Sequence, residues 1–341
     1  MSALSRQTYT DFDVLIVDNA STDGSVGYLE ELCGKGLRLL PCSDGSVNSG
    51  AAAASVPVTA IYMDKNTGFS GAVNAGIRKT ASEYVILLNN DTEPQPDYIK
   101  ELVRALDEDT DKKIFAVSPK MIQLYHKDFL DDAGDGYSLL GWAYQRGVGQ
   151  STSRAKFQSA ANIFSACAGA AIYRRSVFEE LKFSDGDYFD EKHFAYLEDL
   201  DICFRARVHG YQNVYAPLAE VFHVGSGTSG SKYNEFKVRL AARNNVWLNY
   251  KNMPLLMLLI NLPFILAGVL IKQLFFAKLG FGRNYLGGFT EGLKKLGDIR
   301  PHKTCFRASR LLTYIGIEMH IIAGTFSYID DFLYRRFHPH H

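Results

Sequence analysis

The sequence has no excess of charge of either sign. Among its 341 residues, 37 lysines and arginines balance 37 aspartates and glutamates. A protein that binds nucleic acid usually carries a basic surplus, because lysine and arginine neutralise phosphates. The absence of such a surplus argues against nucleic acid as the main partner.

Cysteine is scarce, and residues 1–13 are mainly polar, unlike a signal peptide. The five cysteines are scattered and form no C-x-x-C pair: Cys33, Cys42, Cys167, Cys203 and Cys305. An odd, scattered set of thiols is not a disulfide framework and suits a reducing compartment. We therefore expect the protein in the cytoplasm.

The remaining composition is that of a globular protein, with 47% hydrophobic and 22% charged residues and no internal repeat. The length allows one large domain with an appendage, or two domains. The composition changes near residue 250. We predict an α/β domain over residues 1–250 and an apolar, basic helical tail over residues 251–341.

The most informative stretch runs from Tyr84 to Pro94, where an apolar run stops abruptly at Asn89, Asn90 and Asp91. A short apolar run that ends in polar residues predicts a buried parallel strand. Open α/β sheets bind ligands at that edge, and a carboxylate there can hold a divalent cation and, through it, phosphate. The alternative is that Asp91 caps a helix that begins near Pro96.

Further strands and helices alternate on both sides of this stretch. Strands are predicted at residues 13–18, 37–40, 58–63 and 115–118, and helices after Ser21–Asp23 and at 97–106. This alternation predicts a doubly wound, mostly parallel sheet. Residues 43–55 are rich in Gly, Ser and Ala and predict a surface loop. Residues 124–156 are irregular and predict an excursion on the substrate side.

Two glycine-rich segments have two interpretations each. Residues 66–76 place three glycines and two asparagines at the start of a helix, where backbone amides can face a phosphate or the helix can pack tightly on the sheet. Residues 167–171 are small, and they favour either a ligand lying against the backbone or close packing. The sequence does not choose between these alternatives.

Carboxylates gather again at Glu198, Asp199 and Asp201, at the start of a predicted helix. They either favour the helix N-terminus through its dipole or supply a general base for a reacting hydroxyl. After a short edge strand at residues 214–216, His223 opens a Gly/Ser loop. A lone histidine is commonly structural, but next to a metal-binding carboxylate it is a plausible ligand.

The tail begins after a polar helix at residues 236–252. Residues 253–271 are almost wholly apolar but contain Pro254, Asn261, Pro263 and Gly268, which disfavour a straight membrane span. A second apolar helix is predicted at residues 311–326. The flanking cations favour insertion into the surface of an anionic membrane: Lys251, Lys272, Lys278, Arg283, Lys294 and Lys295. A buried helical hairpin is the alternative.

Together, the ordered segments VDNASTDGS, NTGFSGAVNAG, LLNNDTEP, ACAGAAIYRR, FDEKHFAYLEDLDICFRAR and HVGSG resemble one family. Over about residues 7–251 the chain resembles the inverting family 2 glycosyltransferases, in their rhamnosyltransferase-like branch. The resemblance implies the GT-A fold, an α/β doubly wound mixed sheet flanked by helices. It also implies transfer of a sugar from a nucleoside-diphosphate-sugar, with Mg²⁺ or Mn²⁺, to a hydroxyl of a glycan or polyprenyl-linked acceptor.

The resemblance also implies roles for individual residues. Asp199 corresponds to the catalytic base, Glu198 to a residue that positions the acceptor, and Asp91 and His223 to metal ligands. The positions implied in donor binding are Asp18, Asn66, Gly68, Asn74, Asn89, Asn90 and Gly169. A protein of this kind builds cell-surface polysaccharide while peripherally associated with the inner face of the cell membrane.

Two departures from the family pattern stand out. Asn89 replaces the first acid of the DxD motif, which lowers the charge of the site. The relatives normally begin with an additional strand and a tyrosine-containing loop, whereas this chain begins inside the first helix. We expect the neighbouring strand to be exposed and donor contacts to be lost. An inactive nucleotide-sugar-binding remnant and a metal-dependent nucleotide hydrolase are therefore the alternative functions.

Overall fold

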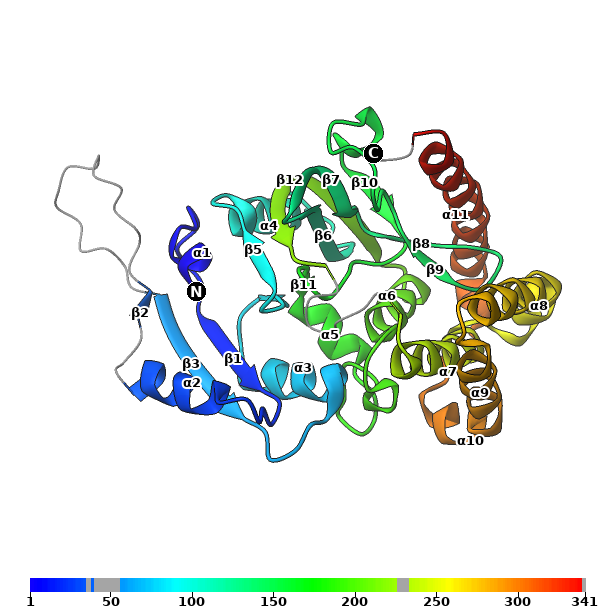
Figure 1. Cartoon of the computed structure of the whole chain (residues 1–341), viewed down its shortest axis with the longest axis horizontal. Coiled ribbons are helices and arrows are strands. Elements are labelled where there is room, and N and C mark those ends of the chain that lie inside the picture. Colours follow the sequence, from blue (N-terminus) through cyan, green and yellow to red (C-terminus); the bar gives the residue numbers. More distant parts are fainter. Residues whose placement is uncertain (35–37, 40–55, 226–232, 339–341) are drawn as a thin grey trace.

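The computed structural model describes residues 1–34, 38–39, 56–225 and 233–338 (Figure 1). A small sheet lies at one end of the molecule, a larger sheet at its centre, and a helical tail at the other end. A third element, the two-stranded hairpin of β8 (Asp135–Tyr137) and β9 (Ala143–Gln145), reaches from the central sheet toward the tail. The loop predicted at residues 43–55 lies outside the described residues.

The small sheet has the strand order β1-β3-β2. Its strands are β1 (Val14–Asp18), β2 (Arg38–Leu39) and β3 (Val56–Tyr62). Strand β1 pairs with β3 in parallel, and β2 pairs with β3 in antiparallel orientation. Three helices belong to this end of the chain: α1 (Ser2–Ser5), α2 (Ser25–Gly34) and α3 (Gly68–Lys79).

The central sheet has seven strands and is mixed. Its strands are β4 (Tyr84–Ile86), β5 (Thr92–Pro94), β6 (Ile114–Gln123), β7 (His126–Asp132), β10 (Ala161–Ile163), β11 (Ile172–Arg174) and β12 (Gln212–His223). The main order is β10-β12-β6-β11-β4, with β5 on β12 and β7 on β6. Among the described strands of this sheet, β6 and β12 form the one parallel pair. The mixed sheet is confirmed, but the prediction of a mostly parallel sheet is wrong.

Two strand predictions need correction. Strand β4 was expected to be a buried parallel strand, but its one partner among the described strands is the antiparallel β11. The short edge strand predicted at residues 214–216 lies in the first half of the twelve-residue β12, which pairs with β10, β6 and β5. Pro217 and Glu220 interrupt the apolar pattern of β12, and the register with β6 is irregular at the same place.

Strand β1 is less buried than its apolar sequence predicts. Residues Val14 to Val17 are half-buried, and only Asp18 at the end of the strand is buried. The reason is that β1 has one neighbouring strand, β3, among the described residues.

Helices cover both faces of the central sheet. Helices α5 (Arg175–Leu181) and α6 (Glu198–Val208) pack with α3 on one face, around Phe115, Tyr173 and Phe178. Helix α4 (Tyr98–Asp107) packs on the other face, around Val117 and Ile172. Ile172 and Tyr173 are consecutive, so their side chains point to opposite faces as strand geometry requires.

The C-terminal helices pack on one another, on α6 and on the hairpin. They are α7 (Glu235–Asn252), α8 (Leu255–Lys278), α9 (Gly282–Lys294), α10 (Leu296–Ile299) and α11 (Leu311–Phe337). Helix α8 runs through Pro263 without ending, and by length and composition it is able to cross a membrane. The boundary that we predict at residue 250 falls within α7, and it stays a prediction.

The β8–β9 hairpin is held between α8 and α11. A Cβ atom at Gly268 of α8 would lie 2.1 Å from the carbonyl oxygen of Leu140, and one at Gly324 of α11 would lie 2.3 Å from that of Tyr137. Only glycine permits these approaches. The hydroxyl of Tyr144 also donates to the carbonyl of Gly324 at 2.6 Å. The tail is therefore joined to the domain through close backbone packing.

Candidate active site

Asp91 and His223 meet because β5 pairs with β12. Asp91 precedes β5, and His223, the last residue of β12, is paired with Thr92. Oδ1 of Asp91 lies 3.6 Å from Nε2 of His223, and the N–H of Val224 donates to the carbonyl of Asp91 at 3.1 Å. Because a strand follows Asp91, the alternative that it caps a helix is wrong. Helix α4 has Asp97 at its N-cap position instead.

The other side of the His223 ring faces Asp131, at the end of β7. Nδ1 of His223 lies 2.7 Å from Oδ2 of Asp131, and this hydrogen bond raises the pKa of His223. Asp131 lies in a stretch with no periodicity, so no pattern in the sequence marks it as a candidate. The feature of the sequence that could have indicated a site here is a cluster of three acids and two glycines: Asp131, Asp132, Gly134, Asp135 and Gly136.

The pair of Asp91 and His223 fits a divalent ion that is also held by phosphate. Among the described residues no group of three or more His, Cys, Asp and Glu side chains is arranged to enclose a metal. Mg²⁺ in nucleotide sites commonly takes one or two protein ligands and completes its shell with water and phosphate oxygens. A carboxylate oxygen and an imidazole nitrogen at 3.6 Å supply such a partial set.

Asp199 lies in the first turn of α6, and backbone groups fix its carboxylate. Oδ2 accepts a hydrogen bond from the N–H of Ala168 at 3.1 Å, and Oδ1 accepts one from the N–H of Leu200 at 2.7 Å. Burial raises the pKa of Asp199, although both hydrogen bonds oppose the rise. Each carboxylate oxygen keeps a second lone pair. Asp199 is thus able to accept a proton from a bound hydroxyl.

Glu198, the neighbour of Asp199, is 6% exposed. Its Oε2 is buried and has no hydrogen-bond partner. Burial and the charge of Asp199 raise the pKa of Glu198 well above its usual value. This shift favours the protonated form of Glu198, in which the carboxyl group is a hydrogen-bond donor rather than a base.

Gly169 and its neighbour Ala168 lie between Asn89 and Asp199. The N–H of Asn89 donates to the carbonyl of Gly169 at 2.8 Å, and a Cβ atom on Gly169 would lie 3.2 Å from Nδ2 of Asn89. Ala168, one residue earlier, donates to Asp199. The small-residue segment therefore lies between the Asn89–Asp91 turn and the start of α6. Asn90, between Asn89 and Asp91, is exposed.

Two further acids belong to the surroundings of Asp199. Asp132 is fully buried; its Oδ2 accepts the N–H of Gly134 at 3.1 Å, and its Oδ1 has no partner. Burial, with the nearby charge of Asp131, raises the pKa of Asp132 to about 7. Burial and the charges of Asp132 and Asp199 raise the pKa of Asp135 as well. A protonated Asp132 reduces the negative charge around the base.

The predicted nucleotide side is ordered by its own hydrogen bonds. Asp18 is buried at the end of β1, and its Oδ2 accepts the N–H of Ser21 at 3.0 Å. Asn66 accepts hydrogen bonds from Nδ2 of Asn19 and from the N–H of Gly68. A Cβ atom on Gly68 would lie 2.2 Å from the carbonyl oxygen of Phe194. Close packing therefore accounts for this glycine, and donor contacts at the three predicted positions stay predictions.

Asn74, to which the resemblance assigns donor binding, is held by hydrogen bonds within the chain. It is fully buried, and its Nδ2 donates to the carbonyl of Phe189 at 2.8 Å and to Glu191 at 3.1 Å. Its Oδ1 accepts the N–H groups of Tyr188 and Phe189. All its hydrogen-bonding positions are occupied, so this arrangement does not support donor binding by Asn74. The residue holds the segment that leads to Glu198.

The loop before α6 is locally strained. Phe194, Tyr196 and Leu197 have φ values of 65°, 70° and 68°, in the left-handed region that side chains disfavour. Nδ2 of Asn244 donates to the carbonyls of three loop residues, at 2.8 to 3.0 Å: His193, Ala195 and Tyr196. Such strain persists where surrounding contacts enforce it, commonly at functional sites.

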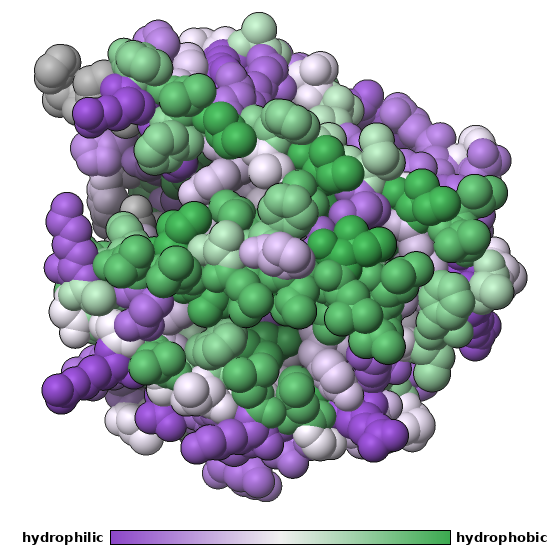
Figure 2. All heavy atoms as spheres, turned by 90° about the vertical axis from the view of Figure 1, so that its right-hand side faces the viewer, coloured by the Kyte–Doolittle hydropathy of each residue, from purple (hydrophilic) through white to green (hydrophobic). Residues whose placement is uncertain are grey.

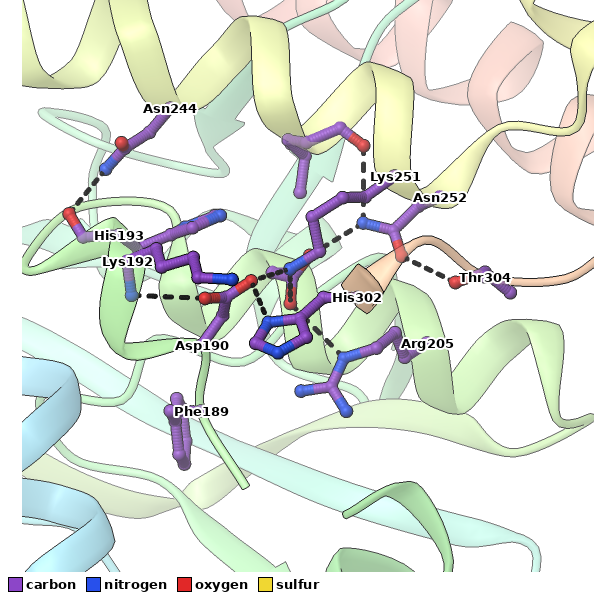
Figure 3. A network of polar contacts seen from close by, with 12 residues as sticks. Phe189, Asp190, Lys192, His193, Arg205, Asn244, Lys251, Asn252, His302 and Thr304 are labelled. Atoms are coloured by element: carbon purple, nitrogen blue, oxygen red, sulfur yellow. Dashed lines mark hydrogen bonds and ion pairs between the residues drawn. The ribbon is translucent and has the colours of Figure 1, made fainter. Parts of the chain in front are cut away.

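A buried ionic network joins this loop to the tail (Figure 3). Nζ of Lys251 reaches Asp190 and lies 3.0 Å from Oδ2 of Asp201, and all three side chains are fully buried. Nδ1 of His302 lies 3.0 Å from Asp190, and Nδ2 of Asn252 donates to Asp201 at 2.8 Å. Burial alone would raise the pKa of Asp190, but Lys251 and His302 hold it below its usual range. Asp201 is thus structural.

Comparison with known proteins identifies the family. A family model described as glycosyl transferase family 2 matches residues 1–182, more than half of the chain. The chain belongs to glycosyltransferase family 2. The fold and the family together make it a glycosyltransferase that uses a nucleotide sugar. The roles of the Asn89–Asp91 turn, the Gly169 segment and the Asp199 carboxylate in this family 2 chain stay predictions.

Two curated relatives of this family 2 chain are similar over 67% of its length. One is the uncharacterized protein y4gI of Sinorhizobium fredii, 24% identical over 238 residues; the match spans only 23% of that longer protein. The other is N-acetylglucosaminyl-diphospho-decaprenol L-rhamnosyltransferase of Mycobacterium tuberculosis, 26% identical over 244 residues, with 72% of that protein covered.

Solved structures of glycosyltransferases share the fold. S. aureus TarS 1–349 in complex with UDP-GlcNAc has a TM-score of 0.52 at 13% identity, covering 95% of this chain and 83% of that one. GalNAc-T7 with UDP, GalNAc and Mn²⁺ has a TM-score of 0.50 at 14% identity, covering 72% of this chain and 43% of that one. These likenesses confirm the GT-A fold of the family 2 chain.

Proposed function

We propose that this chain is an inverting, metal-dependent transferase that moves a sugar from a nucleoside-diphosphate-sugar to a hydroxyl of a glycan or polyprenyl-linked acceptor. The observation that carries the proposal is the carboxylate of Asp199. Two backbone N–H groups hold it, one of them from Ala168, and the adjoining Gly169 is hydrogen-bonded to Asn89, two residues before Asp91. Base and donor-side residues thus share one small scaffold.

Inversion requires one in-line displacement at the anomeric carbon. The acceptor oxygen forms a bond to the anomeric carbon while the bond between that carbon and the diphosphate oxygen breaks. Asp199 takes the proton of the acceptor hydroxyl. The raised pKa of Asp199 supports this role, because a base works best when its pKa lies near the working pH. The raised pKa favours the protonated form of Glu198, and in that form its buried Oε2 is suited to donate a hydrogen bond to an acceptor oxygen.

Asp91 and His223 would hold the Mg²⁺ or Mn²⁺ ion. When bound, such an ion neutralises the charge that grows on the leaving diphosphate. The presence of Asn89 in place of an acid leaves one carboxylate in this turn, so the histidine supplies the second protein donor. For the nucleotide we propose the surface of Asp18, Asn66 and Gly68, and for the donor sugar the surface of Asn89, Asn90 and Gly169.

Two observations support a lipid-linked acceptor. The M. tuberculosis relative carries the name of a rhamnosyltransferase acting on a diphospho-decaprenol-linked sugar. The tail also presents a broad apolar face, formed by α8 and α11 (Figure 2), with Leu255 68%, Leu256 70% and Leu312 83% exposed. We propose that this face rests on the inner surface of the cell membrane, where cell-surface polysaccharides begin, and that rhamnose is the first sugar to test.

Nucleoside diphosphate release tests the chemistry. The purified full chain is incubated with dTDP-rhamnose, UDP-GlcNAc or GDP-mannose, with and without a polyprenyl-diphosphate-linked sugar. We expect release that depends on both the acceptor and a divalent metal. Equal release without acceptor favours the hydrolase alternative. Absence of both donor binding and release favours the inactive remnant.

The membrane proposal needs point variants rather than a deletion. Removing residues 253–341 would expose the core that α8 and α11 cover around Phe204 and Leu248. We expect Leu255→Ser with Leu256→Ser and Leu312→Ser to weaken flotation with anionic liposomes. Leu218→Ser is the matched control, since Leu218 is 62% exposed but lies on β12, outside the tail. Equal flotation of both variants would contradict the proposal.

A further inference from the structure

We infer that Asp131 is a positioning residue that acts through His223. It holds the imidazole in the tautomer that turns the Nε2 lone pair toward Asp91. The inference rests on the proposed metal–diphosphate site and adds to it a residue outside the motifs in the sequence. The observations that carry it are a short hydrogen bond, an irregular strand and the shelter of the three side chains.

The hydrogen bond selects the tautomer. Oδ2 of Asp131 lies 2.7 Å from Nδ1 of His223, while Nε2 lies 3.6 Å from Oδ1 of Asp91. An ionised carboxylate only accepts hydrogen bonds, so the ring hydrogen is on Nδ1, and a neutral imidazole then presents a lone pair at Nε2. Carboxylates that orient a ligating histidine in this way are common around metals and raise its basicity.

A β-bulge aims Asp131 at the histidine. In the pairing of β6 with β7, Ile122 is opposite Leu130, and the preceding Met121 is opposite Asp132. Asp131 is therefore an extra residue on β7 with no partner on β6. Such bulges turn side chains away from the regular alternation and are frequent beside active sites. The bulge lets the consecutive Asp131 and Asp132 take separate surroundings, one at His223 and one near Gly134.

The contact is partly sheltered, and Gly225 lies beside it. The φ of 66° favours glycine there, whereas a Cβ atom would lie at an ordinary contact distance of 3.6 Å from Oδ1 of Asp131. The three side chains are similarly sheltered, with 17% exposure for Asp91 and His223 and 16% for Asp131. The hydrogen bond is thus protected from competing water, while the site still opens to solvent and admits an ion.

The test is a double-mutant cycle on metal affinity. Mn²⁺ binding to the full chain is measured by electron paramagnetic resonance, with the metal alone and with UDP, GDP or dTDP. The variants are Asp131→Asn, His223→Ala, their combination, and Asp91→Ala. Asp128→Asn is the matched control, because Asp128 lies on the same strand, carries the same charge and is exposed.

We expect Asp131→Asn to lower Mn²⁺ affinity by about 10- to 100-fold, as for other residues that orient metal ligands. In the His223→Ala background the same change is expected to have no further effect, which a merely structural role would not produce. An unchanged affinity in Asp131→Asn, with losses in Asp91→Ala and His223→Ala, overturns the inference alone. Absence of Mn²⁺ binding by the unmodified chain overturns the metal site and this inference together. The transferase activity is tested separately, by the release assay.

Discussion

The backbone N–H of Ala168 donates a hydrogen bond to Oδ2 of Asp199 at 3.1 Å. This contact joins the small-residue segment to the first turn of α6, and the next residue, Gly169, accepts a hydrogen bond from Asn89. Three segments far apart in the sequence are thereby held together: the turn after β4, the segment before β11 and the start of α6. The proposed base and the proposed metal ligand Asp91 keep a fixed relation as a result.

Asp91 is expected to be essential for metal-dependent donor binding. Asp91→Asn keeps the size of the side chain but removes the one carboxylate of the Asn89–Asp91 turn. We expect calorimetry with Mn²⁺ and the nucleotide sugar found by the release screen to show no metal-dependent affinity. Glu93→Gln is the control, because Glu93 forms an exposed pair with Arg6. Unchanged affinity in Asp91→Asn would remove this residue from the site.

Lys251 is expected to be a major contributor to stability. Lys251→Met leaves the carboxylates of Asp190 and Asp201 buried without their shared cation. Breaking a buried ion pair typically costs about 3–5 kcal/mol. Urea unfolding should show a loss of that order, whereas Lys100→Met, which removes an exposed pair with Asp97, should change the unfolding free energy by less than about 1 kcal/mol. Equal effects of the two variants would contradict the role assigned to the network.

Asp132 is expected to make stability depend on pH. Its pKa is about 7 in the folded chain, against an ordinary 3.8. Between these values the folded state holds a proton that the unfolded chain has released, so the unfolding free energy rises as the pH falls through this window. Asp132→Asn should flatten that dependence, and exposed Asp128→Asn should not. Unfolding curves between pH of about 5 and about 8 measure the slopes, and parallel slopes in Asp132→Asn and the unmodified chain would refute the prediction.

Part of the site could be predicted from the sequence because its residues lie where local patterns end. Asp91 follows an apolar run, and Asp199 lies in the first turn of a helix. His223 is a candidate metal ligand only in combination with a nearby carboxylate, because a lone histidine is commonly structural. Gly169 was left open between ligand contact and packing, and its approach to Asn89 shows the packing directly.

The remaining features depend on contacts that no local pattern contains. Asp131 and Asp132 take their roles from a bulge that exists only because β7 pairs with β6. Asn74 lies in a segment that matches the family pattern, yet the loop at residues 188–191 occupies all its hydrogen-bonding groups. The length of β12 was hidden by Pro217 and Glu220, which the irregular pairing with β6 accommodates.

The measurement that tests the account most directly compares sugar transfer and donor binding in Asp199→Asn. The amide keeps the size of the side chain but cannot take the acceptor proton, and general-base catalysis typically contributes about 10²- to 10⁴-fold. We predict a loss of transfer of at least that order with donor affinity retained, and with Asp128→Asn behaving as the unmodified chain. Normal turnover in folded Asp199→Asn would contradict the account.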